Sequence, residues 1–445
     1  MQNSLHRKRH LTSFQIIIFG FAAVILFGAL ILMLPIASAS GQFTSFNKSL
    51  FTATSAVCVT GLVLVDTGSY WSAFGQTVIL ILIQIGGMGV VTVAASITMI
   101  SGRKISLMQR STMQEALAAP KVGGIVRLTG FIIKTTFAVE LLGALIMMPV
   151  FCRDYNLKGV WMAVFHSISA FCNAGFDLMG TKGAPFVSLT SYAENPVINM
   201  TVMLLIIIGG IGFLTWDDIR SNGLHMKKYR MQSKVIFVTT AVLLVLPVLY
   251  FFCCEFKNLN MGLRIFYSLF QTVTPRTAGF NTADLTKVSG TGQAVLILLM
   301  LIGGSPGSTA GGMKTTTVAV LFASAISVFK RKEDTQFFGR RVAGNAIKNA
   351  STILSMYIIL FFFGGLIISI AEGLPMGVCL FETASAVGTV GLSLGITPGL
   401  GLISQIVLII LMFSGRVGGL TLIYAALSGT SKNVSKMPQE RITVG

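Results

Sequence analysis

Long stretches without a charge are the feature that most constrains how this chain can fold. Residues Ile16 to Leu34 form 19 consecutive positions without a charged or strongly polar side chain, and comparable stretches recur along the chain. A hydrocarbon core of ~30 Å is crossed by about 20 apolar helical residues, so each long stretch fits a bilayer. Of the 445 residues, 53% are hydrophobic and only 11% are charged, which excludes an ordinary soluble domain. The sequence predicts an all-α integral membrane protein.

The apolar segments fall into two length classes. Eight long segments predict membrane spans, near 14–36, 72–100, 128–151, 196–216, 235–253, 293–329, 346–371 and 400–428. A shorter segment lies between each odd-numbered span and the next, near 47–57, 158–172, 260–273 and 375–387. These segments of 11 to 15 residues are too short to cross the membrane, so they are predicted to be re-entrant half-helices.

The basic residues predict the topology. With both termini in the cytoplasm, the inside segments carry 24 Lys and Arg against six acids, whereas the outside segments carry eight of each. The formal net charge of +18 then falls entirely inside, as the positive-inside rule requires. The charge therefore needs no nucleic-acid partner. It is explained better by topology than by contacts of the basic loops with anionic lipid or a soluble partner, and the protein is predicted in the plasma membrane.

The half-helices end in a motif that occurs four times. Each has a bulky apolar residue ten positions before a glycine and another just after it, in Phe51–Leu62, Phe165–Phe176, Leu269–Phe280 and Phe381–Leu392. The four glycines, Gly61, Gly175, Gly279 and Gly391, lie 114, 104 and 112 residues apart. The chain is thus predicted to be four repeats of span, half-helix, loop and span, at 1–101, 102–217, 218–329 and 330–428, with a cytoplasmic tail at 429–445.

A second small-residue motif follows each glycine loop. It reads Ile85-Gly86-Gly87, Ile208-Gly209-Gly210, Ile302-Gly303-Gly304 and Phe413-Ser414-Gly415. Small residues are common where membrane helices pack closely, so helix packing and a direct role in a transport path remain equally open for this motif.

Four half-helices that stop midway through a membrane can bind a cation. Their C-terminal ends carry partial negative charge and unpaired carbonyls. Backbone carbonyls of four converging loops can replace the hydration shell of an alkali ion, and glycine permits the unusual backbone angles that such loops need. The candidate filter residues are Val59, Thr60, Gly61, Asn173, Ala174, Gly175, Thr277, Ala278, Gly279, Thr389, Val390 and Gly391. Arg276 and Glu382 are expected on the outer side of these loops, as braces rather than ion ligands.

The sixth span contains a polar interruption. Its candidate gating loop, 303–314, is rich in helix-breaking residues, with Gly303, Gly304, Ser305, Pro306, Gly307, Ser308, Thr309, Ala310, Gly311 and Gly312 as its core. Arg416 aligns with Gly304 relative to the filter glycines, and a buried arginine usually faces a polar interior. We expect Arg416 to bind carbonyls of this loop or to repel cations while the gate is shut. A purely structural role remains the alternative, as does a packing or salt-bridge role for Glu140.

These motifs resemble the superfamily of potassium transporters that includes the Trk, Ktr and plant HKT proteins, and the membrane subunits of Ktr systems most of all. The resemblance covers essentially the whole chain and implies one K⁺ path with pseudo-fourfold symmetry, one glycine per filter loop and a gate at 303–314. Plant relatives that prefer sodium have serine in the first loop, where this chain has Gly61. The resemblance also implies a homodimer on a cytoplasmic RCK-type ring that binds a nucleotide, with Na⁺ as a candidate activator.

The predicted function is therefore K⁺ translocation through a channel-like pore in an uptake system. The chain itself is expected to hold no cofactor and to use K⁺ only at the filter carbonyls. The alternative is a sodium-coupled K⁺ carrier that works by alternating access. An enzyme is not expected, because no acid–base pair or nucleophile is placed for chemistry. A membrane-embedded enzyme or scaffold would be indifferent to changes at Gly61 or Gly175.

Overall fold

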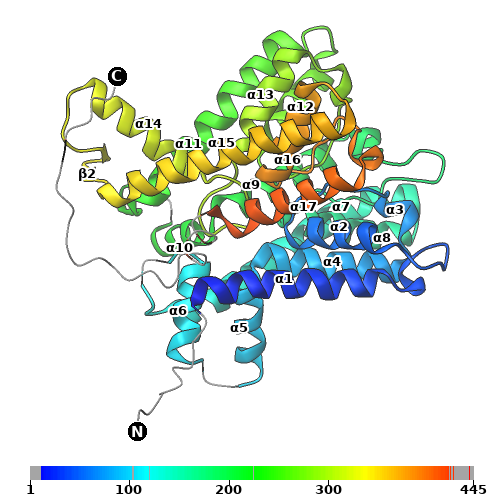
Figure 1. Ribbon diagram of the computed structural model, residues 1–445, viewed down its shortest axis with the longest axis horizontal. Coiled ribbons are helices and arrows are strands. Elements are labelled where there is room, and N and C mark those ends of the chain that lie inside the picture. The colour runs from blue at the N-terminus through cyan, green and yellow to red at the C-terminus, as the bar shows by residue number, and fades with distance from the viewer. Residues whose placement is uncertain are drawn as a thin grey trace.

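The computed structural model describes residues 12–102, 105–119, 121–223, 225–419, 421, 424 and 440. These residues form a bundle in which helices far apart in sequence run side by side (Figure 1). Within the described residues, the only sheet is a two-residue hairpin, with β1 (Gln336–Phe337) antiparallel to β2 (Arg340–Arg341). The all-α membrane architecture is confirmed. The predicted tail at 429–445 lies outside the described residues, except for Glu440.

Four long helices begin the predicted quarters of the chain. They are α1 (Ser13–Leu32), α7 (Ile125–Tyr155), α11 (Met231–Tyr250) with its π-helical extension η4 (Phe251–Glu255), and α15 (Gly344–Glu372). Each is apolar and long enough to cross a membrane. Local signals set their ends: Thr12 and Gln15 form a capping box before α1, and Gly373 ends α15 in the left-handed conformation (φ 66°).

Four short helices match the predicted half-helices to within one residue at each end. They are α2 (Phe46–Val57), α8 (Lys158–Phe171), α12 (Met261–Val273) and α16 (Met376–Gly388). Each packs against the long helix that precedes it. At 12 to 14 residues they extend only about 18–21 Å, less than a hydrocarbon core.

The helices that follow the glycine loops are interrupted, and here the structure differs from the prediction. The segments at 72–100 and 196–216 are not straight spans: α4 (Ala73–Met88) and α5 (Val90–Ile100) meet at 95°, and α9 (Pro196–Ile211) and α10 (Phe213–Asn222) meet at 93°. Gly89 (φ 85°) and Gly212 (φ 102°) stand at these bends, where left-handed backbone favours glycine. Each of these glycines lies two positions after the Gly-Gly pair of the second motif, and small residues in an apolar run do not by themselves predict a bend.

The predicted interruption of the sixth span is confirmed. α13 (Gly290–Leu301) and α14 (Thr315–Phe329) are separated by the non-helical residues 302–314. In the fourth quarter, α17 (Leu402–Val417) also ends at a glycine with positive φ, Gly418. Counting each bent pair once, six segments of the described chain are long and apolar enough to cross a membrane, so the number of eight spans stays a prediction.

Short helices complete the connections. They are η1 (Pro35–Ala37), α3 (Thr67–Tyr70), α6 (Leu107–Ala116), η2 (Ser188–Tyr192), η3 (Met226–Lys228), η5 (Leu285–Lys287) and η6 (Thr397–Gly399). The outer faces of the long helices expose large apolar side chains such as Phe27 (67%) and Leu141 (61%), as expected for surfaces in contact with lipid.

In three of the four quarters, a glycine of the second motif brings the outgoing helix against the end of its own half-helix. A Cβ at Gly86 would lie within 3.0 Å of the Val57 carbonyl oxygen. The same holds for Gly209 against Phe171 and for Gly415 against Val387. This close approach favours helix packing for the motif, because any side chain would push the half-helix out of place.

We therefore expect Gly86→Ala to destabilise the protein by about 1–3 kcal/mol, because the added methyl overlaps the end of α2. Gly377→Ala is the matched control, since no atom lies within 4 Å of a Cβ at that helical position. The control should keep or slightly raise the melting temperature in detergent. Equal melting temperatures for the two variants would contradict this account of the packing.

Candidate ion pathway

The four glycine loops meet and close a ring. A Cβ at Gly61 would lie within 3.0 Å of the Ala174 carbonyl oxygen, in the next loop along the chain. The same contact recurs from Gly175 to Ala278, from Gly279 to Val390 and from Gly391 back to Thr60. Each glycine thus faces the carbonyl just before the next glycine, and the last loop meets the first. We call this arrangement the glycine ring.

The backbone of the ring has the same form in each loop. All four glycines have positive φ, at 90°, 68°, 81° and 94° in chain order. The residues two positions before them also have positive φ, between 51° and 65°, at Val59, Asn173, Thr277 and Thr389. Left-handed backbone in the turn after each half-helix directs the following carbonyls toward the neighbouring loop. The twelve predicted filter residues are thus brought together.

A hydroxyl near the end of each half-helix holds its loop, a feature that sequence reasoning missed. Ser55 and Ser385 accept hydrogen bonds from the N–H groups of Gly61 (3.0 Å) and Gly391 (2.9 Å). In the other two loops the hydroxyl donates to the carbonyl that follows the glycine, from Ser169 to Phe176 (2.7 Å) and from Thr274 to Phe280 (2.6 Å). Three of these four hydroxyls lie six positions before the glycine, a recurrence that the aligned motifs contain.

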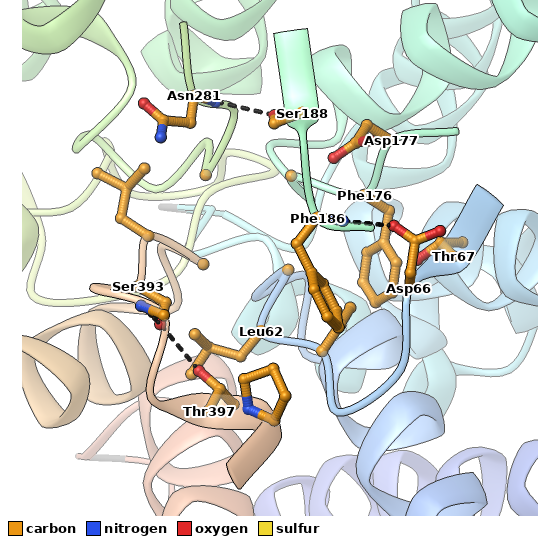
Figure 2. A pocket seen from close by; sticks show the side chains of 18 of the residues that line it. Leu62, Asp66, Thr67, Phe176, Asp177, Phe186, Ser188, Asn281, Ser393 and Thr397 are labelled. Carbon is orange, nitrogen blue, oxygen red and sulfur yellow. Dashed lines mark hydrogen bonds between the residues drawn. The ribbon is translucent and has the colours of Figure 1, made fainter. Parts of the chain in front are cut away.

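A cavity of about 180 Å³ opens on one side of the ring, lined by all four glycines (Figure 2). Asp66 and Asp177 lie on its wall. Asp66 is fully engaged, since it accepts hydrogen bonds from the Ser69 N–H and hydroxyl and from the Phe186 N–H (2.9 Å). Asp177 accepts from the Met179 N–H (3.0 Å), and desolvation by burial raises the pKa of its carboxyl to about 6. Its charge at neutral pH makes this cavity attractive to cations.

Glu382 braces the fourth loop, as predicted. Its carboxylate accepts hydrogen bonds from the hydroxyls of Ser393 (2.8 Å) and Thr397, both beyond Gly391. Arg276 differs from its prediction: it lines a small cavity with Gly210 and Gly304, so it lies toward the sixth-span interruption rather than on the outer side.

Glu140 is buried between helices without a basic partner. Its two carboxylate oxygens accept from the Gln84 amide at 3.0 and 3.2 Å, and no ion pair to it occurs in the described part of the chain. The packing role therefore fits Glu140 better than the salt-bridge role.

The interruption of the sixth span is tied to the outgoing helix of the second quarter. The N–H groups of Ser305 and Thr309 donate to Gly210 (2.9 Å) and Gly209 (3.3 Å). At the start of α10, the Phe213 N–H donates to the Gly307 carbonyl (2.6 Å). The segment thus satisfies its backbone groups with protein partners, as non-helical chain at membrane depth must.

The same segment also contacts the C-terminal end of half-helix α8 and the loop after half-helix α16. The Thr309 hydroxyl donates to the Phe171 carbonyl at the end of α8 (3.0 Å), and a Cβ at Gly311 would overlap the Thr389 side chain. The segment therefore lies directly against the ring, on the side opposite the 180 Å³ cavity.

Two cationic side chains hold this segment. The Arg416 guanidinium donates to the carbonyls of Thr309, Gly86 and Gly87, the last at 3.0 Å, so the predicted contact with carbonyls of the interruption is confirmed. Sequence reasoning counted Lys314 with the cytoplasmic bases. Lys314 is also the last residue of the predicted segment 303–314, and its ammonium donates to the Ala310 carbonyl (2.7 Å), beside a cavity of about 310 Å³ that Arg416 also lines.

These features define a class: a membrane protein with a narrow ring of backbone loops, with a cavity on each side of the ring and carboxylates on the wall of one of them. The chain belongs to the TrkH family of cation transport proteins, whose match covers residues 2–436. The resemblance drawn from the glycine loops is thereby confirmed. As a member of a cation transport family, the protein is a transporter rather than an enzyme.

Several named proteins are similar over nearly the full length. The potassium/sodium uptake protein NtpJ of Enterococcus hirae is 38% identical, over 98% of each chain. The Ktr system potassium uptake protein B of Bacillus subtilis is 37% identical, over 97% of this chain and 96% of that protein. The crystal structure of the potassium transporter TrkH from Vibrio parahaemolyticus shares the fold, with a TM-score of 0.74 and 19% identity over 95% of this chain and 86% of that one.

Removing the charge of Asp177 should weaken cation capture. We expect Asp177→Asn to raise the apparent KM for transported cation about fivefold, since a carboxylate near a cation in a partly solvated site contributes on the order of 1 kcal/mol. Initial uptake rates in proteoliposomes, with K⁺ and Na⁺ tested separately, give the measurement. Asp154→Asn, which alters a carboxylate outside this cavity, should leave KM unchanged. Equal KM values for Asp177→Asn and wild type would contradict a role for this charge.

Proposed function

We propose that this protein is the potassium-translocating subunit of a plasma-membrane uptake system, with the glycine ring as its selectivity filter. The cyclic contact from each glycine to the next loop's carbonyl carries the proposal. It supplies carbonyl oxygens from four directions around one axis within a single chain. The names of the two relatives described above support K⁺ as the ion, since each is a potassium uptake protein.

The chemistry of the ring suits a dehydrated alkali cation. Four half-helix C-termini direct partial negative charge at the centre, and carbonyl dipoles take the place of water. One glycine per loop makes a short filter with few ion sites. The proposed ligands are carbonyls of the segments that end in Gly61, Gly175, Gly279 and Gly391. The glycine at position 61, where relatives that prefer sodium have serine, supports selectivity for K⁺ over Na⁺.

The segment 303–314 is the proposed gate. It lies between the ring and the 310 Å³ cavity, and its contacts with Gly209, Gly210 and Arg416 are polar and easily exchanged for water. In this proposal Arg416 fastens the gate in its shut position and repels cations that approach it. Opening would break these contacts while the ring stays in place.

A sodium-coupled carrier is the second candidate function. One relative is named a potassium/sodium uptake protein, which supports a role for Na⁺ as a coupled ion or as an activator. Fixed Na⁺:K⁺ stoichiometry and slow turnover in proteoliposomes would favour the carrier, whereas uncoupled, voltage-driven K⁺ flux would favour the pore.

The proposed assembly follows the family resemblance and the name of the Ktr system protein. In it, two copies of this chain, each with four repeats and both termini in the cytoplasm, sit on an RCK-type regulatory ring. The regulatory nucleotide binds that ring, not this chain. The basic segments predicted inside and the tail at 429–445 are the surfaces proposed for the contact.

Gly61→Ser tests the filter. Serine is strained at φ 90°, and its Cβ would overlap the Ala174 carbonyl, so the carbonyl positions should shift. We expect the K⁺:Na⁺ permeability ratio to fall about tenfold, equivalent to ~1.4 kcal/mol, measured in proteoliposomes with the membrane potential clamped. Gly262→Ser is the control, at a half-helix position with no atom within 4 Å of a Cβ. Unchanged selectivity in Gly61→Ser would mean that the ring is architectural.

Arg416→Gln tests the gate. Loss of a charge-assisted hydrogen bond of about 1.5–3 kcal/mol to the gating segment should raise basal K⁺ flux about tenfold or more. Shortening 305–312 should act in the same direction. Arg264→Gln is the control, because Arg264 likewise donates to a backbone carbonyl, that of Phe252 (2.8 Å), but away from the ring. Flux that stays at the wild-type level in both gate variants would overturn the assignment.

A further inference from the structure

Four basic side chains converge on a cavity that the transport path does not use. This cavity of about 250 Å³ lies between the start of α7 and α10 and is lined by Lys121, Arg127, Arg220 and Arg230, with Asp217 as the one acid. Topology alone explains why bases lie on this predicted cytoplasmic side, but it does not require them to gather around one hollow. We call this hollow the α7–α10 cavity.

Three of the four bases are free to bind an anion. Arg230 is committed, since it pairs with Asp217 at 2.9 Å and with Asp218 at 3.3 Å. Lys121, Arg127 and Arg220 are exposed and have no ion-pair partner within 4.0 Å among the described residues. The positive charges without an acidic partner are therefore those of Lys121, Arg127 and Arg220, on the side of the cavity that the start of α7 and Arg220 form.

A contact with Phe131 positions the Arg220 side chain at this side of the cavity. Its guanidinium lies 4.7 Å from the centroid of the Phe131 ring, in a cation–π contact that crosses from α10 to α7. Phe131 is one turn after Arg127 on the same face of α7, so the two guanidinium groups flank the cavity from two helices.

The backbone adds donors at the same place. Gly124 precedes α7 in the left-handed conformation (φ 82°) and supplies no side-chain cap. Ile125 donates to Val122 and Leu128 begins the helical hydrogen bonds, which leaves the N–H groups of Val126 and Arg127 without a partner in the described chain. A helix of 31 residues carries positive partial charge at this end.

An exposed apolar surface of α7 lies beside the cavity. Along α7, Arg127 shares a face with the exposed Lys134 and, further along the helix, with Leu141 (61% exposed) and Leu145 (52%). Because α10 turns 93° away from α9, it runs across the bundle rather than along it, and it exposes Ile219 (41%). The acyl chains of a phospholipid bound here could lie along this apolar surface. A free phosphate ion has no acyl chains and would make no use of it.

We propose that the α7–α10 cavity binds the phosphate of an anionic phospholipid, with Arg127, Arg220 and Lys121 as its cationic contacts. The phosphate lies between the two guanidinium groups and the start of α7, and the acyl chains lie along the exposed apolar face of α7. The site also has a route to the gating segment, because α10 begins at Phe213, which donates to the Gly307 carbonyl. That link rests on the proposed function, whereas lipid binding does not.

The test measures binding, so it is independent of transport. Purified protein in a neutral detergent is titrated with dioleoyl phosphatidylglycerol, dioleoyl phosphatidylcholine or inorganic phosphate, and its melting temperature is followed. Phosphatidylglycerol should raise the melting temperature of the wild type by several degrees, as a ligand of the folded state does. Arg127→Gln with Arg220→Gln should lose at least half of that shift. Arg340→Gln with Lys348→Gln, which removes two exposed bases outside the cavity, should keep it.

Several outcomes would overturn the proposal. They are an equal shift in both double variants, a shift of the same size with phosphatidylcholine, or a shift that inorganic phosphate alone reproduces, which would make the cavity a free-anion site. If the first double variant does not fold, Arg220→Gln alone and native mass spectrometry of retained phosphatidylglycerol give the same decision. Wild type should then retain more lipid than the variant, and equal retention would refute the site. Lipid binding without any change in K⁺ flux would leave the site standing and reject only the link to the gate.

Discussion

The contact between each ring glycine and the carbonyl of the next loop is the constraint on which the rest of the structure depends. There is no room for a Cβ at any of the four positions, and each has a backbone conformation that favours glycine. The close approach leaves no room for side chains at the four glycine positions. The loops need rigid supports that stop midway through the bundle, which the half-helices α2, α8, α12 and α16 provide.

Those supports are fixed in turn by further close contacts. Gly86, Gly209 and Gly415 let the outgoing helices press against the half-helix ends, and the hydroxyls of Ser55 and Ser385 hold the ring glycines from behind. In lipid there is little hydrophobic gain from helix association, so close packing and hydrogen bonds must supply the specificity. The glycine content is thus a consequence of building a backbone-lined path in a membrane.

The side of the ring that holds residues 302–314 is built from contacts that can be exchanged. This segment pairs its backbone with carbonyls of Gly209 and Gly210 and receives Arg416 and Lys314, each on carbonyl oxygens rather than on acids. Hydrogen bonds to neutral carbonyls hold a cationic side chain less firmly than a buried carboxylate would. In the proposed function, a rigid ring next to a segment of this kind separates ion recognition from the control of access.

The sequence by itself determined the membrane class, the four half-helices to within one residue, the four glycine loops and the interruption after Leu301. These depend on local properties: hydropathy, segment length, and the conformations that glycine and proline allow or forbid. The repeated spacing added the expectation that the loops act together, and it aligned Arg416 with Gly304. The recurring serines at Ser55, Ser169 and Ser385 were also within reach of that comparison.

Only the tertiary structure decided the cyclic order of the loops, the bends at Gly89 and Gly212, and the contact of the Lys314 ammonium with the Ala310 carbonyl. It also decided that Arg416 reaches Gly86, which lies 330 residues away, and that Arg220 lies over Phe131 beside the start of α7. Such pairings follow from where whole helices pack against each other. A single chain without that packing contains no local signal for them, because the partners are distant in sequence and carry no complementary charge.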